Sequence, residues 1–159
     1  MELVRHQNEQ FVFVMSAQEK LLLLSLLSLF PLTPLAHPRR QLSRLAEMPD
    51  ARENQQLLAE SLKAQQEHSR QWVAGLHVPE CFKPAPGGFQ LTLNRAEVEE
   101  LLQVLNDVRI GSWLALGAPD TEAEEELRLT EQTSAHGHRL QLAGLFEMFF
   151  LKAIGRADT

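Results

Sequence analysis

Hydrophobic residues recur at the spacing of an α-helix along residues 94–117, which read NRAEVEELLQVLNDVRIGSWLALG. Asn94 is a favoured N-cap residue, and Glu97 stands where the carboxylate of a capping box belongs. Gly117 is a typical stop at the other end of a helix. One stripe contains the apolar positions: Val98, Leu101, Leu102, Leu105 and Leu116. The pattern predicts a helix that packs along this stripe.

A charged residue interrupts the stripe. At about 100° per residue, Arg109 falls in the middle of the apolar side, whereas Asp107 points to the opposite side. A buried guanidinium needs a partner, because an unpaired buried charge costs several kcal/mol or more. The residues after it are nearly all apolar: Ile110, Trp113, Leu114, Ala115 and Leu116. That composition indicates a central helix that is buried on several sides.

The last helix is predicted from residue 139 to about residue 154. By the same angular count, Glu147 lies at the centre of one apolar face. That face contains Leu140, Ala143, Leu151 and Ile154, and a second face contains Phe146, Phe149 and Ala153. Such a helix is either central to the core or covered by a second subunit, so a homodimer through this helix is one prediction.

Arg109 and Glu147 are therefore expected to meet as a buried ion pair between the central and the last helix. A guanidinium–carboxylate pair satisfies both groups, and it contributes orientation more surely than stability. The side-chain nitrogen and oxygen atoms should lie within about 4 Å of each other, and a separation beyond roughly 8 Å would contradict the hypothesis. An active-site interpretation stays open, because buried charges also mark catalytic clefts.

Residues 1–15 have the pattern of a β-hairpin, with strands at 2–6 and 10–15 around a polar turn. Residues 89–93 alternate apolar and polar side chains, as a half-buried strand does. An isolated hairpin is marginally stable, so we expect these strands to form one small antiparallel sheet. Residues 76–88 contain several prolines and glycines and are predicted to be irregular.

Ser16 and Glu19 form a second capping box, which opens a leucine-rich helix that ends at Pro31. Its apolar run of about ten to twelve residues is shorter than the roughly 20 that a membrane span requires. A signal peptide is the nearer alternative, since Leu35-Ala36 could be a cleavage point. The long, partly acidic segment before the run favours a buried core helix.

A third capping box, formed by Asp50 and Glu53, opens a long polar helix that runs to about Ala74, with Gly75 as its stop. A narrow stripe contains its apolar positions: Leu57, Leu58, Leu62 and Trp72. Such a stripe is typical of a peripheral helix that packs on one side only. The fold class that follows is mainly α, a helical bundle with a small antiparallel β-sheet, in a single domain over residues 1–159.

Composition and charge narrow the class of protein further. The chain has 159 residues, of which 44% are hydrophobic and 23% charged, an ordinary globular balance. A net charge of −6 argues against nucleic-acid binding, since phosphate contacts need a basic surface. Cys81 is the single cysteine, which excludes an intramolecular disulfide and a multi-cysteine metal site. We expect a soluble, cytoplasmic protein without a membrane segment.

Two clusters of charge have a functional and a structural interpretation. The basic cluster contains Arg39, Arg40 and Arg44. It is either a docking site for an anionic partner, including DNA, or the solvated face of a short helix, which we favour. Residues 120–126 contain five carboxylates but lack the glycine and the alternating ligands of a calcium loop. We interpret them as the acidic first turn of a short helix.

Other candidate chemistry is sparse. His136-Gly137-His138 brings two imidazoles close together, but no third ligand is identifiable nearby, so a flexible surface loop is expected instead of a zinc site. The sequence contains no G-x-S-x-G, phosphate-loop or dinucleotide-binding motif. We therefore assign no catalytic residue, no metal and no cofactor.

Several features occur in the order in which a known family has them. A short β start leads into the helix capped by residues 16–19, and the motif Leu-Asn-Asp-Val-Arg follows at residues 105–109. A small residue–Trp–Leu run then ends at residues 116–117, before a final helix that carries Glu147. These residues resemble a bacterial domain-of-unknown-function family, best represented in actinobacteria, whose genes often lie near the gene for the ClpS protease adaptor. Phe146 stands where that family usually has Gln.

The resemblance implies a mostly helical protein with no established activity, and the gene neighbourhood implies a regulatory or proteolysis-linked partner. We accordingly predict a non-enzymatic interaction or regulatory protein. The alternative is an enzyme of unknown reaction, with a cleft formed by Asn106, Asp107, Arg109 and Glu147. A deep pocket with converging polar groups would favour the enzyme, and an exposed apolar patch would favour the interaction protein.

Overall fold

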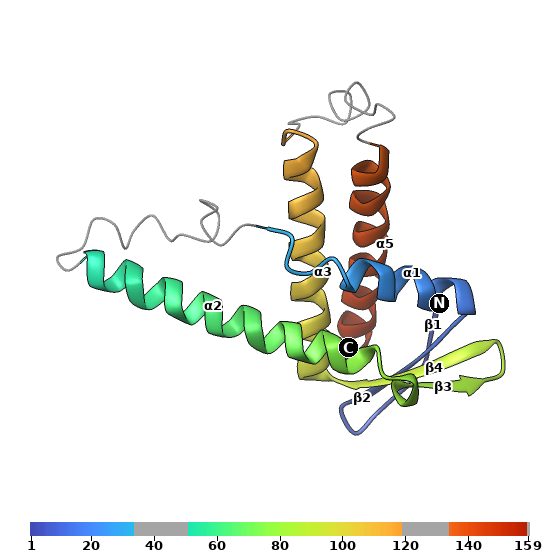
Figure 1. Ribbon diagram of the computed structural model, residues 1–159. Helices are drawn as coiled ribbons and strands as arrows, with labels where there is room; N and C mark the ends of the chain where they lie inside the picture. The colour runs from blue at the N-terminus through green and yellow to red at the C-terminus, as the bar shows by residue number, and fades with distance from the viewer. Residues whose placement is uncertain (34–50, 119–133, 159) are drawn as a thin grey trace.

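The computed structural model describes residues 1–33, 51–118 and 134–158. Its elements in chain order are β1 (Glu2–Gln7), β2 (Gln10–Met15), α1 (Ala17–Leu27), α2 (Ala51–Leu76), the short 3-10 helix η3 (Pro79–Cys81), β3 (Phe82–Ala85), β4 (Gly88–Asn94), α3 (Arg95–Ala115) and α5 (Ser134–Ala157). Helices α3 and α5 stand side by side over the sheet, α1 crosses α5, and α2 projects away from this body (Figure 1). The predicted class, mainly α with a small antiparallel sheet, is confirmed.

The four strands form one antiparallel sheet in the order β1-β2-β4-β3. The predicted hairpin is confirmed, and so is its pairing with residues 89–93, because Phe13 of β2 lies opposite Leu91 of β4. Asn8 and Glu9 form the hairpin turn with φ angles of 52° and 62°, the left-handed conformation that two-residue turns of type I′ require. The side chains that face the helices are buried: Phe11, Phe13, Met15, Leu91 and Leu93.

The prediction of an irregular segment at residues 76–88 is wrong. Helix α2 continues to Leu76, η3 follows it, and β3 then pairs with β4, with Phe82 opposite Leu91. β3 is an edge strand, and an edge strand tolerates a proline such as Pro84, since its outer side needs no ladder hydrogen bond. Pro79 therefore belongs to η3, and the later prolines and glycines of this segment belong to an edge hairpin.

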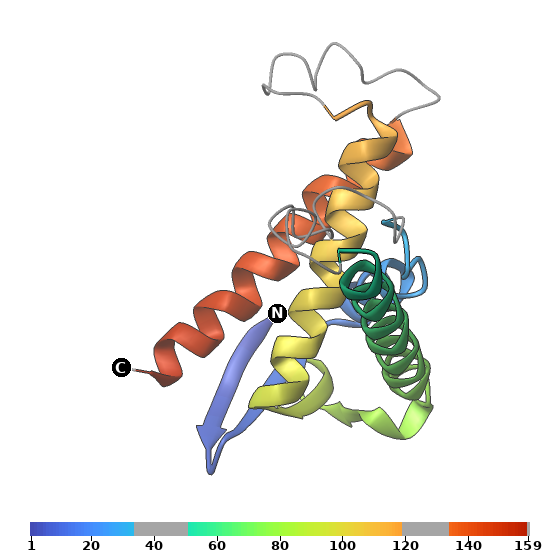
Figure 2. The ribbon, with the colours of Figure 1, turned by 90° about the vertical axis from the view of Figure 1, so that its left-hand side faces the viewer.

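Helix α3 begins as predicted. The side-chain oxygen of Asn94 accepts the Glu97 N–H at 2.9 Å, and the Asn94 N–H donates to Glu97 Oε2 at 2.8 Å. Its inner positions are fully buried: Val98, Leu101, Val104, Leu105 and Val108. The predicted burial beyond Arg109 is confirmed for Leu116, which is 3% exposed. It is wrong for the other residues, because the upper turns of α3 extend past α1, α2 and the sheet (Figure 2). These residues are half-buried or exposed: Ile110, Trp113, Leu114 and Ala115.

Helix α5 packs against α3 and onto the sheet, where the ring of Phe150 meets Phe13 edge-on at a centroid distance of 5.1 Å. Its buried positions are Ala143, Phe146, Phe150 and Ala153. Leu151, predicted to lie on an inner face, is 58% exposed, so that assignment is wrong. The helix begins at Ser134, and the surface loop predicted for residues 136–138 is instead part of its first turns.

Helix α1 opens with the predicted capping box of Ser16 and Glu19. The prediction of a core helix is confirmed for one of its faces, which buries Leu23, Leu26 and Leu27. The helix ends at Leu27, before the predicted end at Pro31. No helix in the described ranges combines the length and the apolar character that a membrane crossing needs.

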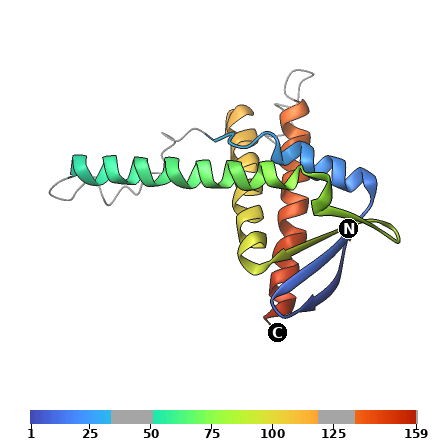
Figure 3. The same ribbon diagram turned by 60° about the horizontal axis from the view of Figure 1, so that its bottom comes forward.

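Helix α2 packs at its C-terminal end only and projects from the rest of the fold at its N-terminal end. Its C-terminal turns reach the rest of the protein, where Ser69, Val73 and Leu76 are buried. Its N-terminal turns extend beyond α3 on the side away from α5 (Figures 1 and 3). Leu57, predicted to pack, is 63% exposed because it lies on this projecting part. Three predictions fall outside the described residues: the Asp50 cap, the acidic run at 120–126, and the basic cluster of Arg39, Arg40 and Arg44.

The segment after α1 crosses α3 at Gly111. A Cβ atom at this position would lie 2.6 Å from Leu32 Cγ and 2.9 Å from the backbone carbonyl carbon of Leu32. Both distances are too short for carbon atoms, and the backbone contact cannot be relieved by rotating a side chain. Glycine is therefore what allows the two segments to approach so closely.

We expect Gly111→Ala to lower the free energy of unfolding by about 1–3 kcal/mol, because the added methyl group overpacks the crossing. Gly144 in α5 provides the matched control, since a Cβ atom there meets nothing within 4 Å. Gly144→Ala should stabilise the protein by up to about 1 kcal/mol through helix propensity alone. Denaturant titration of both variants measures the difference, and equal stabilisation by both would show that the crossing has room for alanine.

Candidate functional site

The predicted contact between Arg109 of α3 and Glu147 of α5 is present. The Nε atom of Arg109 lies 2.9 Å from Glu147 Oε2, within the predicted limit. The Nε–H is not aligned for a hydrogen bond with that oxygen, so the contact is an ion pair and not a bidentate hydrogen bond. Another nitrogen of the same guanidinium, Nη2, donates to Asn106 Oδ1 at 2.9 Å.

The pair is less enclosed than predicted, because the Arg109 side chain is 41% exposed and the Glu147 side chain 14%. Burial raises the pKa of Glu147 above its ordinary value of 4.5, and the neighbouring Arg109 offsets this rise only in part. The folded state therefore holds this proton more tightly than the unfolded state does. Glu147 consequently stabilises the fold most below pH 4.5, and the contribution falls as the pH rises from 4.5 through the raised pKa.

Asp107 lies on the side of α3 away from Arg109, and its carboxylate binds backbone N–H groups. It is 5% exposed, and its Oδ1 accepts the backbone N–H groups of Leu32 at 2.7 Å and of Thr33 at 3.1 Å. The Thr33 hydroxyl donates to the backbone carbonyl of Asp107 at 2.8 Å. A carboxylate that accepts backbone N–H groups in this way fixes the segment after α1 against α3.

The four residues predicted as a binding site therefore do not form one cluster. Arg109 contacts both Asn106 and Glu147 at the edge of the α3–α5 interface, whereas Asp107 holds residues 32–33 on the opposite side. The angular count along α3 correctly separated Asp107 from Arg109. It could not identify the partner of Asp107, because that partner comes from a distant part of the chain.

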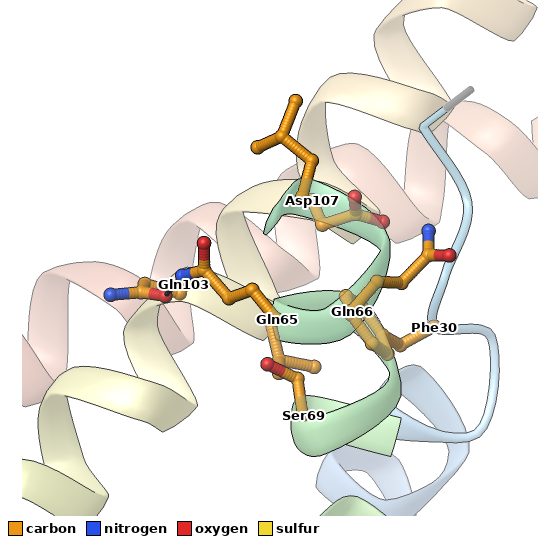
Figure 4. Close-up of a pocket in the computed structure, with 8 residues that line it drawn as sticks. Phe30, Gln65, Gln66, Ser69, Gln103 and Asp107 are labelled. Carbon is orange, nitrogen blue, oxygen red and sulfur yellow. Dashed lines mark hydrogen bonds between the residues drawn. The ribbon is translucent and has the colours of Figure 1, made fainter. Parts of the chain in front are cut away.

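A pocket of about 160 Å³ lies between α2 and α3 (Figure 4). Its lining consists of Phe30, Leu62, Gln65, Gln66, Ser69, Gln103, Val104 and Asp107. Gln65 Nε2 donates to Gln103 Oε1 at 2.9 Å, and the Ser69 hydroxyl donates to Glu100. Amide and hydroxyl groups of this kind can hydrogen-bond a small polar molecule. Among the described residues that line the pocket, the candidate nucleophile Ser69 has no lysine, cysteine or histidine beside it.

Metal chemistry finds no support in the part of the chain that the structure describes, where no three His, Cys, Asp or Glu side chains gather around one point. Cys81 is half-buried, and its thiol donates to the Gly75 carbonyl at 3.2 Å. That bond joins the end of α2 to η3, which is a structural role.

Helix α5 carries an exposed apolar row that the sequence analysis missed. This outer row consists of Leu145, Met148 and Leu151, which are 63%, 52% and 58% exposed. At about 100° per residue the three side chains lie within about 120° of one another, opposite the buried face. The spacing of three residues was visible in the sequence. The predicted apolar face was centred on Glu147, however, and it therefore included Leu151.

A groove adjoins the outer row where α1 crosses α5. This α1–α5 groove has a volume of about 330 Å³ and is lined by Leu22, Ser25, Leu26, Leu29, His138, Arg139 and Leu142. Leu142 precedes Leu145 by one turn of α5, so the groove continues towards the outer row. Most of its lining residues are leucines, and its polar residues are Ser25, His138 and Arg139.

Comparison of the chain with models of protein families, with curated proteins and with solved structures finds no match. The resemblance to the actinobacterial family therefore stays a prediction. The outer row and the α1–α5 groove, together with the pocket between α2 and α3, are the surfaces from which a function can be argued.

Removing the Asp107 carboxylate should lower the free energy of unfolding much more than neutralising it. Asp107→Ala leaves the N–H groups of Leu32 and Thr33 without their acceptor, and we expect a loss of about 2–4 kcal/mol in the free energy of unfolding. Asp107→Asn keeps an oxygen acceptor and should lose about 1 kcal/mol. Glu99→Ala, at an exposed position of the same helix, should change the value by less than about 0.5 kcal/mol. Similar small losses for both Asp107 variants in urea titrations would contradict this role.

The two members of the α3–α5 ion pair should respond unequally to mutation. Arg109→Met leaves a mostly buried carboxylate without its counter-charge, and we expect a loss of about 1–2 kcal/mol at pH 7. Glu147→Gln leaves a guanidinium that water can reach and removes the cost of ionising a buried carboxyl, so the free energy of unfolding at pH 7 should be unchanged or rise by less than about 1 kcal/mol.

The same two variants should differ in their dependence on pH. In Glu147→Gln the fall in stability above pH 4.5 should disappear, because the titrating group is gone. In Arg109→Met the fall should extend to higher pH, since the group that lowers the pKa of Glu147 is removed. Chemical denaturation at a series of pH values measures both effects, and parallel pH profiles for the two variants and the parent protein would exclude this account.

Proposed function

We propose that the protein is a non-enzymatic interaction or regulatory protein that binds a protein partner on the outer row of α5. The supporting observation is that Leu145, Met148 and Leu151, three neighbours on one helix, are each more than half exposed. Scattered exposed leucines are common, but a contiguous apolar patch on a soluble surface marks an interaction site.

The surroundings of the outer row fit a helical partner. The row continues into the α1–α5 groove through Leu142, so apolar surface follows α5 over several turns. Lys152 and Arg156 are exposed beside it and supply a polar rim. A partner helix that presents apolar residues at spacings of three and four would place its anchors along this surface. The family resemblance makes a proteolysis-linked partner the first class to test.

The contacts of the predicted site residues favour a structural role over catalysis. An active site would require Asn106, Asp107, Arg109 and Glu147 to converge on one cavity. Asp107 instead lies across α3 from the other three, and each of the four has a contact within the protein that accounts for its position. The enzyme hypothesis therefore has less support than the interaction hypothesis.

A photoreactive amino acid at position 148 should crosslink the partner in a lysate of the native host. The same probe at Thr92, which is exposed on the outer face of the sheet, is the control. Adding Leu145→Glu and Leu151→Glu to the chain labelled at position 148 should abolish the adduct, with a change in Tm below about 2 °C, because both side chains are exposed. Absence of an adduct at position 148, or the same adducts at positions 148 and 92, would refute the proposal.

A further inference from the structure

The projecting end of α2 carries an apolar side chain with an acidic rim. We call residues 51–61 the arm, since these turns of α2 extend beyond the other helices and the sheet that the structure describes (Figures 1 and 3). Leu57 on the arm is 63% exposed. Glu53 and Glu60, four residues before and three residues after it, are exposed on the same side of the helix. The arm thus presents one large apolar group between two carboxylates.

The surface of α5 has the complementary character. Glu147 is the single carboxylate of this helix, and it lies beside Arg109. The remaining charged groups of α5 are cations, although the whole chain has a net charge of −6. The lining of the α1–α5 groove combines leucines, among them Leu22, Leu29 and Leu142, with one cation, Arg139. An apolar groove that contains a cation matches an apolar side chain with an anionic rim.

The arm of one molecule cannot fill the groove of the same molecule. Figures 1 and 3 show that the arm extends from α3 to the side away from α5, whereas the groove lies between α1 and α5. Leu57 can therefore enter this groove only in another copy of the chain.

We propose that the protein forms a two-fold dimer by exchange of arms. In this dimer, Leu57 of each copy enters the α1–α5 groove of the other, and Glu53 and Glu60 lie beside the partner's Arg139. With two-fold symmetry, both arm–groove contacts form between the same two copies, so no arm and no groove is left free to continue into a fibre. The arm gains cover that a short, largely polar stretch of helix lacks by itself. The inference rests on the proposed function, because it assigns a second copy of this chain to part of the same protein-binding surface.

Light scattering after gel filtration tests the dimer directly. At about 100 μM the full chain should have twice its mass of 18.0 kDa. Leu57→Asp should weaken the dimer at least about tenfold, since it places a charge in the apolar groove. Gln55→Asp, at an exposed position on another side of the arm, should leave the dimer unchanged within about twofold. Far-UV circular dichroism should show equal helix content for both variants and the parent protein.

A charge exchange tests the pairing of arm and groove. Glu60→Arg and Arg139→Glu, each alone, should weaken the homodimer about tenfold through like-charge contacts. An equimolar mixture of the two variants should recover dimerisation to within about threefold of the parent protein. In the mixed dimer, one arm with arginine meets a groove with glutamate, and the other contact keeps the parental pair.

Three results would overturn the arm exchange: a monomer at about 100 μM, no recovery in the mixture, or a dimer that tolerates Leu57→Asp but is lost with Met148→Glu. The last result would indicate pairing of two α5 helices, which leaves the proposed function of the outer row intact. A dimer that needs Leu57 and shows no adduct with another protein at position 148 would support the arm exchange and refute the proposed function. The two proposals can therefore fail separately.

Discussion

The packing of α3 against α5 over the sheet fixes the place of nearly every other element. The lower turns of α3 are enclosed by α5 on one side, by the sheet below, and by α2 and the segment after α1 on the other side (Figures 1 and 2). Apolar burial supplies the driving force, since Val98, Leu101 and Leu105 have no exposed surface. Burial alone has no direction, so the crossings are set by close contacts at Gly111 and by polar bonds to Asp107.

The charged residues of α3 show two ways in which a charge serves a helix interface. Asp107 is buried, and its carboxylate oxygen accepts N–H groups that would otherwise need water. Arg109 stays partly hydrated and forms an ion pair with Glu147 at the rim of the contact with α5. The bonds of Asp107 fix residues 32–33 on α3, and the ion pair of Arg109 orients α3 relative to α5. Both charges have partners within the protein that account for their place on the helix.

Local chemistry was readable from the sequence, whereas long-range contacts were not. The capping boxes at Ser16 and Asn94 depend on residues three apart, and both are present. The sheet of β1, β2 and β4 followed from alternation of side chains. Of the predicted apolar faces of α5, Ala143, Phe146 and Ala153 are buried. Leu151 was placed wrongly, because Glu147, on which the angular count was centred, lies at the rim of the interface. The exposure of Leu57 depends on how far α2 projects, which no local pattern records.

The order of the strands also has a consequence for how the chain is made. β2 lies between β1 and β4, and Phe13 pairs with Leu91 far along the sequence. A ribosome therefore releases the aromatic hairpin long before the strand that completes it, and α5, whose Phe150 covers Phe13, emerges later still. Non-local pairing of this kind slows folding and leaves hydrophobic surface exposed during synthesis. The nascent chain should accordingly be a better client for a holding chaperone than the mature protein is.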